Sequence, residues 1–121
     1  MNNNNSMSEH DLQKNIVELL RYCGYTVFCL DVMGGLKFLT HTDNKRYAFI
    51  NHYKSMGYTI GQPDLVILLN GKVIFIEAKN KKGQQTIEQK EVQSIVQSLG
   101  HIYLVWNTLE DTQKWIQNQN H

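Results

Sequence analysis

Apolar residues near the start of the chain recur at helical spacing, which predicts an amphipathic helix that begins after Ser8 and ends at Gly24. Residues 25–31 are rich in β-branched and aromatic side chains and predict a strand. A short extended arm is expected at 36–43, followed by a helix that ends at Gly57. The first half of the chain is therefore predicted to contain a helix, a strand and a second helix.

Two apolar segments, 64–69 and 72–79, follow one another with only Asn70-Gly71 between them. Asn-Gly between two β-prone runs is the strongest short-range signal of a two-stranded hairpin. With a two-residue turn, Leu69 faces Lys72, and the strands then pair outward from that point. This part of the chain is predicted to be an antiparallel hairpin.

The remaining segments complete an alternating pattern of strands and helices. Thr86 and Gln89 form a capping box that opens a helix ending at Gly100. A strand is expected at 101–106, with a short helix after it. The predicted core face of the helix that follows the hairpin consists of Val92, Ile95, Val96 and Leu99.

The predicted order of elements favours an α/β fold. The strand–helix–strand unit at 73–106 is expected to be a right-handed crossover between parallel strands. Since the hairpin is antiparallel, the central sheet is mixed, and helices before and after it cover its faces. Hydrophobic residues make up 41% of the 121 positions, which suits one folded domain at 8–118 after a disordered tail at 1–7.

Composition excludes some classes of protein and leaves others open. The longest apolar run is too short to span a membrane, and the first residues lack the features of a secretory signal. Two cysteines do not make a disulfide framework, so we expect a cytoplasmic domain with reduced thiols. The net charge of +1 identifies no partner, but basic stretches at 37–54 and 72–90 flank an isolated Asp64, which is a hint of a polyanion.

The hairpin register brings candidate chemistry together at its open end. Asp64 lies directly opposite Glu77, and directly opposed residues point to the same face of a sheet. Lys79, two residues further on, shares that face. Opposed carboxylates repel unless a cation lies between them, and Mg²⁺ is commonly held by one or two carboxylates. Spacing alone also allows a structural interpretation, in which these are charged residues at exposed strand ends.

These residues resemble a known nuclease signature. Pro63-Asp64 followed by Glu77-Ala78-Lys79 resembles the PD-(D/E)xK motif, and the wider pattern is similar to its VRR-NUC branch, small nuclease domains of phages, bacteria and a eukaryotic repair nuclease. The further positions that carry the resemblance are Glu9, Gln13, Met56-Gly57, Gly61-Gln62, Leu65, Ile76, Gly83, Thr86-Ile87-Glu88-Gln89 and Gly100.

The resemblance implies a restriction-endonuclease-like αβββαβ core and a DNA endonuclease that depends on Mg²⁺ or Mn²⁺. It implies that Asp64 and Glu77 are metal ligands, with the Ala78 carbonyl as a third, and that Lys79 is the catalytic lysine. Glu9 would be an accessory acid that completes the metal site, although an acid in the first turn of a helix also favours the helix dipole. Gln89 would position Lys79, a water or the phosphate, although it is equally the second half of a capping box.

Partners follow from the same resemblance and from the basic segments. Free-standing members of this branch are similar to Holliday-junction resolvases, which implies a homodimer acting on branched DNA in a bacterial or phage-infected cell. Residues 47–53 and Trp115-Ile116 offer apolar surface for the dimer, or cover the core. A non-cleaving DNA-binding or interaction module with the same fold is the alternative. The candidate phosphate contacts are Lys37, Lys45, Arg46, Lys54, Lys81 and Lys82.

Overall fold

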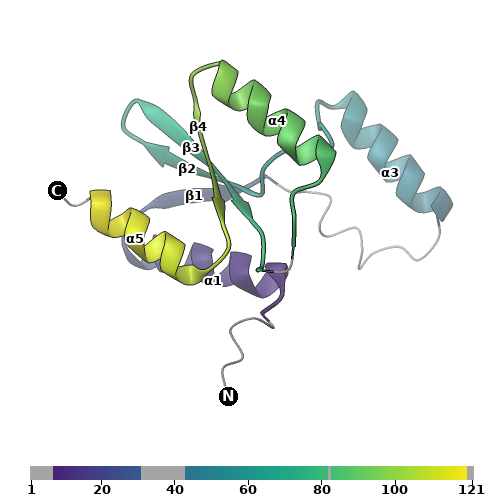
Figure 1. The fold of residues 1–121 in the computed structure, drawn as a ribbon. Helices are drawn as coiled ribbons and strands as arrows, with labels where there is room; N and C mark the ends of the chain where they lie inside the picture. The colour runs from purple at the N-terminus through teal and green to yellow at the C-terminus, as the bar shows by residue number, and fades with distance from the viewer. Residues whose placement is uncertain (1–6, 31–42, 82, 120–121) are drawn as a thin grey trace.

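The described residues form a four-stranded mixed sheet with helices packed against it (Figure 1). The structure, a computed structural model, describes residues 7–30, 43–81 and 83–119. In sheet order, the strands are β1 (Thr26–Cys29), β2 (Leu65–Leu69), β3 (Lys72–Ala78) and β4 (Ile102–Trp106). The helices are α1 (Glu9–Tyr22), α3 (Asp43–Ser55), α4 (Ile87–Ser98) and α5 (Leu109–Gln119).

Strand pairing confirms the predicted hairpin and the predicted parallel pair. β2 and β3 are antiparallel, and Leu69 pairs with Lys72 as the Asn-Gly turn requires. Gly71 in that turn has a φ of 77°, a conformation that glycine adopts without strain. β3 and β4 are parallel, whereas β1 is antiparallel to β2, so the sheet is mixed and the α/β fold class is correct.

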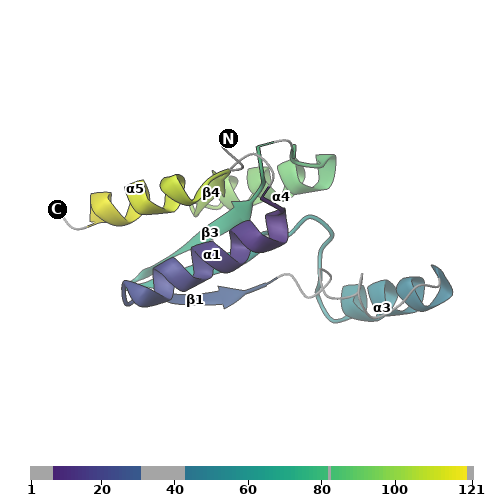
Figure 2. The ribbon, with the colours of Figure 1, turned by 90° about the horizontal axis from the view of Figure 1, so that it is seen from below.

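One face of the sheet carries the hydrophobic core and is covered by α1 and α5 (Figures 1 and 2). Leu12, Ile16 and Leu20 from α1 are buried against alternate residues of β2 and β3. Trp115 on α5 packs between Tyr25 and Trp106, with ring centroids 5.1 and 6.0 Å away. The buried core consists of Leu12, Ile16, Leu20, Val27, Leu65, Ile67, Ile74, Ile76, Ala78, Trp106 and Ile116.

The helix that follows the hairpin is less buried than its sequence pattern predicts. α4 begins with the predicted capping box, and it packs against β4 at the edge of the sheet. Val92 and Val96 are half-buried, but Ile95 is 57% exposed and Leu99 is 69% exposed. The expectation that all four residues line a core is therefore wrong, because the apolar stripe extends beyond the part of the sheet that α4 covers.

α3 projects away from the sheet (Figures 1 and 2). Its bounds agree with the predicted helix. Residues 36–42 of the predicted arm at 36–43 lie outside the described residues, and Asp43 begins α3 instead. Residues 1–6 of the predicted tail at 1–7 also lie outside them, whereas Met7 is half-buried against the core. Tyr47 is exposed, and the rings of Phe49 and Tyr53 stack with centroids 6.4 Å apart. In the described ranges, every helix is too short or too polar to cross a membrane.

Candidate active site

The open end of the β2–β3 hairpin brings Asp64 and Glu77 together. Asp64 immediately precedes β2, and the pairing of Leu65 with Ile76 places Asp64 opposite Glu77. The Asp64 carboxylate accepts a hydrogen bond from the Ala78 backbone N–H at 2.8 Å. That bond ties the Asp64 side chain across the hairpin, to the residue next to Glu77. The carboxylates therefore lie on one face, as the register predicts.

Glu77 is buried among uncharged hydrogen-bond donors and beside other charges. Its side chain is 1% exposed, Oε2 accepts from Gln89 Nε2 at 2.9 Å, and Oε1 accepts from the Tyr103 hydroxyl at 3.4 Å. Burial, followed by the neighbouring Asp64 charge, raises the pKa of Glu77 to about 8, although Lys79 partly opposes this. Without a cation, the two carboxylates destabilise one another.

Lys79 is fixed by hydrogen bonds of its backbone, and its side chain forms an ion pair. Its N–H donates to the Trp106 carbonyl, and its carbonyl accepts from Asn107 Nδ2, both at 3.0 Å. Its ammonium lies 3.7 Å from Glu9 Oε1, at the start of α1. The residue itself is buried, with 9% exposure. The structure thus brings Glu9, which lies far away in sequence, to the candidate site through Lys79.

The loop after β3 approaches Glu9 closely. A Cβ atom at Gly83 would overlap the Glu9 carboxylate and come within 3.0 Å of Asn80 Oδ1. The Gly83 N–H donates to that Asn80 oxygen at 2.8 Å. A side chain at position 83 would therefore require the Glu9 carboxylate to move away from this loop.

The turn before Asp64 packs on the first turn of α4. Gly61 has a φ of 93°, and a Cβ atom there would lie 2.5 Å from the Glu88 carbonyl carbon and 2.8 Å from the Gln89 nitrogen. Gln62 Nε2 donates to the Leu30 carbonyl at 2.8 Å, so this turn is also tied to the end of β1. The Gly-Gln-Pro-Asp segment thereby joins β1, β2 and α4 at the site.

Gln89 has two contacts at once. Its Oε1 accepts from the Thr86 N–H at 2.9 Å, which completes the capping box, while its Nε2 donates to Glu77. The sequence left open whether Gln89 caps the helix or contacts the site. The geometry shows that one amide group makes both contacts, because its oxygen and nitrogen point in different directions.

Two polar residues contact the site although sequence reasoning did not select them. Tyr103 is 4% exposed and contacts Glu77, and Asn107 contacts the Lys79 carbonyl. The parallel pairing of Phe75 with Tyr103 puts the tyrosine two residues before the partner of Glu77, and therefore on the same face of the sheet. Only the β3–β4 register, which is not encoded by a turn, could have identified Tyr103.

The predicted phosphate-binding residues fall in different places. Lys81 is exposed, two residues after Lys79, and Lys54 is exposed on α3. Lys37 and Lys82 lie outside the described residues. Lys45 and Arg46 belong to α3, but the structure does not describe their side chains. Of the residues in this group whose side chains are described, Lys81 is the nearest in sequence to the candidate site.

The donor set suits a hard divalent cation with few protein ligands. In the described part of the chain, no group of three or more His, Cys, Asp or Glu side chains is arranged to hold a metal ion. Asp64 and Glu77, with the backbone carbonyl of Ala78 between Glu77 and Lys79, offer only oxygen donors. Mg²⁺ is usually held by one or two carboxylates, and a bound cation would relieve the repulsion that helps to raise the pKa of Glu77.

Two solved structures share this fold. One, described as a "VRR_NUC domain", has a TM-score of 0.62 and 20% identity, over 90% of this chain and 94% of the other. Another, a "VRR_NUC domain protein", has a TM-score of 0.65 and 18% identity, over 92% of this chain and 86% of the other. By sequence, no family model and no curated protein matches the chain. The mixed sheet and its flanking helices therefore show that this chain has the fold of a VRR-NUC domain.

Proposed function

We propose that the protein is a Mg²⁺- or Mn²⁺-dependent endonuclease that hydrolyses phosphodiester bonds in DNA. The observation that carries the proposal is the arrangement of Asp64, Glu77 and Lys79 at one end of the β2–β3 hairpin. The fold shared with VRR-NUC domains supports it, since such a fold is a nuclease type. DNA is the polyanion that the basic segments would accommodate.

Each side chain of the site has a role in this hydrolysis. Asp64 and Glu77, with the Ala78 carbonyl, would hold the cation, which when bound would polarise a phosphoryl oxygen. Lys79 would orient the attacking water and balance the charge that develops on the phosphate. The water oxygen would form a bond to phosphorus and release one proton to solvent as one P–O ester bond breaks, and the leaving oxygen would take up one proton from solvent. Glu9 would complete the site from α1.

Other residues would orient this set without touching the reacting atoms. Gln89 and Tyr103 each donate to one oxygen of Glu77, which fixes the direction of the carboxylate. Asn107 holds the backbone of Lys79. Metal ligands that are held by such hydrogen bonds are better preorganised for binding. These residues are positioning residues in the proposed mechanism.

Contacts with the DNA backbone would come from the basic residues around the site. Lys81 follows Lys79 and is exposed, so it can reach a phosphate next to the cleaved one. The same role is proposed for Lys37, Lys45, Arg46, Lys54 and Lys82.

We further propose a homodimer that prefers branched DNA, including Holliday junctions. One site cuts one strand, whereas a two-fold dimer places two sites on one junction. Tyr47 and Phe49, exposed on the projecting α3, supply apolar surface for the contact. Trp115 and Ile116 pack on the core, so they are left out of the proposed interface. Light scattering should report twice the mass of the chain, and a mass equal to one chain with and without DNA would contradict the dimer.

Cleavage assays with matched variants test the enzyme. The purified chain should cut branched, flapped or linear DNA in Mg²⁺ or Mn²⁺, and Asp64→Ala and Lys79→Ala should each lose at least about 100-fold in rate. Lys72→Ala, an exposed lysine at the other end of β3, serves as the control and should cleave normally. Cleavage that persists in both site variants would show that another site or a contaminant cuts the DNA.

Calorimetry separates the enzyme from the non-cleaving alternative. The proposed site should bind Mn²⁺ or Mg²⁺ at millimolar concentrations, and Asp64→Ala should abolish that binding. Salt-sensitive DNA binding without any metal binding would favour a binding module with the same fold.

A further inference from the structure

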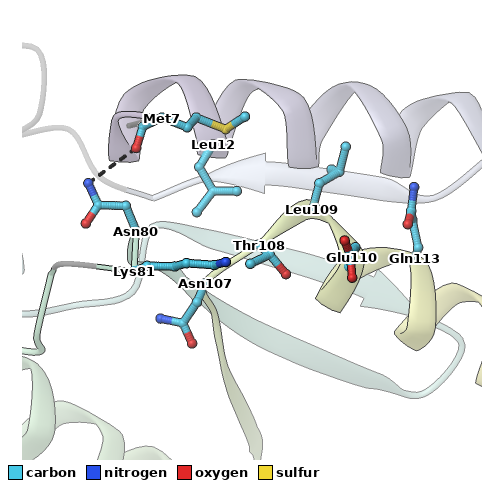
Figure 3. A pocket seen from close by; sticks show the side chains of 9 residues that line it. All are labelled: Met7, Leu12, Asn80, Lys81, Asn107, Thr108, Leu109, Glu110 and Gln113. Carbon is cyan, nitrogen blue, oxygen red and sulfur yellow. Dashed lines mark hydrogen bonds between the residues drawn. The ribbon is translucent and has the colours of Figure 1, made fainter. Parts of the chain in front are cut away.

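A cavity of about 360 Å³ lies beside Asn80 and Lys81, the residues that follow Lys79 in the chain (Figure 3). It is enclosed by the start of α1, the segment after β3 and the start of α5. Its volume falls within the range that is typical of small-molecule sites. The lining residues that the argument uses are Met7, Lys81, Asn107, Leu109, Glu110 and Gln113.

The wall of this cavity is shared with the proposed active site. Asn80 and Lys81, which line it, follow directly after Lys79. Asn107 lines it as well and donates to the Lys79 carbonyl. Asn80 Nδ2 donates to the Met7 carbonyl at 3.3 Å, which closes the cavity beside α1. A molecule in the cavity would therefore contact the residues that hold the backbone of Lys79.

The lining combines three kinds of group. Met7 and Leu109 are half-buried and supply apolar surface, on which a flat ring can pack. Asn107, Glu110 and Gln113 supply amide and carboxylate groups that can pair with the edge of a heterocycle. Lys81 extends along the cavity between Asn80 and Thr108, where its ammonium can meet an anion (Figure 3). Within the described ranges, the Lys81 ammonium and the Gln113 amide make no hydrogen bond, so both are available to a ligand.

We propose that this cavity binds one unpaired nucleotide of the DNA substrate, with its base against Met7 and Leu109 and its phosphate at Lys81. The inference rests on the proposed function and names the feature of the substrate that the site selects. A nucleotide combines a flat ring, a polar edge and an anion, which are the three features that the lining matches. A base within a duplex is stacked and paired, and extracting it costs free energy, whereas a base in an overhang or at a branch enters freely.

The selectivity of the protein would then come from this cavity. Duplex DNA meets Lys81 and the other cations through its phosphates alone, whereas DNA with an unpaired nucleotide also fills the cavity. Burial of roughly 60 Å² of apolar surface of one base is equivalent to about tenfold in affinity. Branched, flapped and frayed DNA would be favoured over continuous duplex without any need for a base sequence.

Binding measurements with two DNA probes test the inference. The probes are a short blunt duplex and the same duplex with a single-stranded overhang, labelled for fluorescence anisotropy and measured in Ca²⁺ to prevent cleavage. The test variant is Gln113→Trp, whose indole ring would block the cavity from an exposed position of α5. The control is Gln117→Trp, one turn further along α5, exposed and outside the cavity. Melting temperatures establish that both variants are folded.

The wild-type chain should bind the overhang about tenfold more tightly than the blunt duplex. Gln113→Trp should reduce this ratio to about one while blunt-duplex affinity is unchanged, and Gln117→Trp should retain it. Equal binding of both probes by the wild-type chain would overturn the inference, as would a preference that survives in Gln113→Trp. If the preference depends on Gln113 but no cleavage occurs in Mg²⁺ or Mn²⁺, the nuclease proposal fails and the nucleotide site stands. If the chain cleaves DNA but shows no preference for the overhang, the nucleotide site fails and the nuclease proposal stands.

Discussion

Gln89 donates a hydrogen bond to Glu77 over 2.9 Å while its own oxygen accepts from the Thr86 N–H. One side chain thus begins α4 and orients the buried carboxylate of the proposed metal site. The position of α4 and the direction of Glu77 are linked by this amide group.

Variants of Gln89 and Thr86 separate the two contacts. Thr86→Ala removes the capping bond to the Gln89 N–H but leaves Glu77 its donor, so it should lower the free energy of unfolding by about 1 kcal/mol with little loss of cleavage. Gln89→Ala removes both contacts and should also raise the metal concentration needed for half-maximal cleavage. Chemical denaturation and metal titrations measure the two effects. Equal metal dependence in both variants would show that Gln89 acts through the helix alone.

The pH dependence of stability follows from Glu77. Its pKa of about 8 in the folded protein lies above its ordinary value of 4.5, so the folded state favours the protonated acid. The stability that this contributes is fully present below about pH 4.5 and is lost as the pH rises through about 8. Thermal unfolding in a chelating buffer should show this fall, and Glu77→Gln should reduce it. Added Mn²⁺ should stabilise the wild type most at high pH, where Glu77 is ionised. The idea fails if Glu77→Gln has the same pH profile as the wild type.

Tyr103→Phe tests a residue that only the structure identifies. Loss of the hydroxyl leaves Glu77 Oε1 without this donor, which should raise the pKa of Glu77 further and weaken metal binding several-fold. The metal dependence of cleavage should shift to higher concentrations and higher pH. Tyr25→Phe, on the opposite face of the sheet against Trp115, should change neither. Unchanged metal dependence in Tyr103→Phe would remove Tyr103 from the positioning residues.

Gly61→Ala tests whether the turn before Asp64 must contact α4. Alanine at 61 adds backbone strain at a positive φ and a collision with the Glu88 and Gln89 backbone. Gly71→Ala is the matched control, because its φ is also positive but no heavy atom beyond the two neighbouring residues lies within 4 Å of the added Cβ. Gly71→Ala should lower the free energy of unfolding by about 1 kcal/mol through backbone strain alone. Gly61→Ala should lower it further, because of the added collision, and should cleave poorly. Equal losses in stability, with normal cleavage, would show that the turn yields without disturbing the site.

Local chemistry in the sequence is sufficient to predict most of the elements. The Asn70-Gly71 turn sets the register of the hairpin, and a register determines which side chains face each other along both strands. The sequence alone therefore predicts that Asp64, Glu77 and Lys79 lie together. The capping box at Thr86 and Gln89 likewise depends on residues three positions apart, and it is present as predicted.

Contacts between segments that no turn or cap connects depend on tertiary packing. The ion pair of Glu9 with Lys79, and the bond from Tyr103 to Glu77, require α1 and β4 to pack beside β3. The exposure of Ile95 and Leu99 follows from the place of α4 at the edge of the sheet. An apolar stripe in a sequence shows that a helix has two faces, but it does not show how much of the apolar face finds a partner. The register that pairs the carboxylates is local and can be read from the chain, whereas the residues that surround them are set by packing across the sheet.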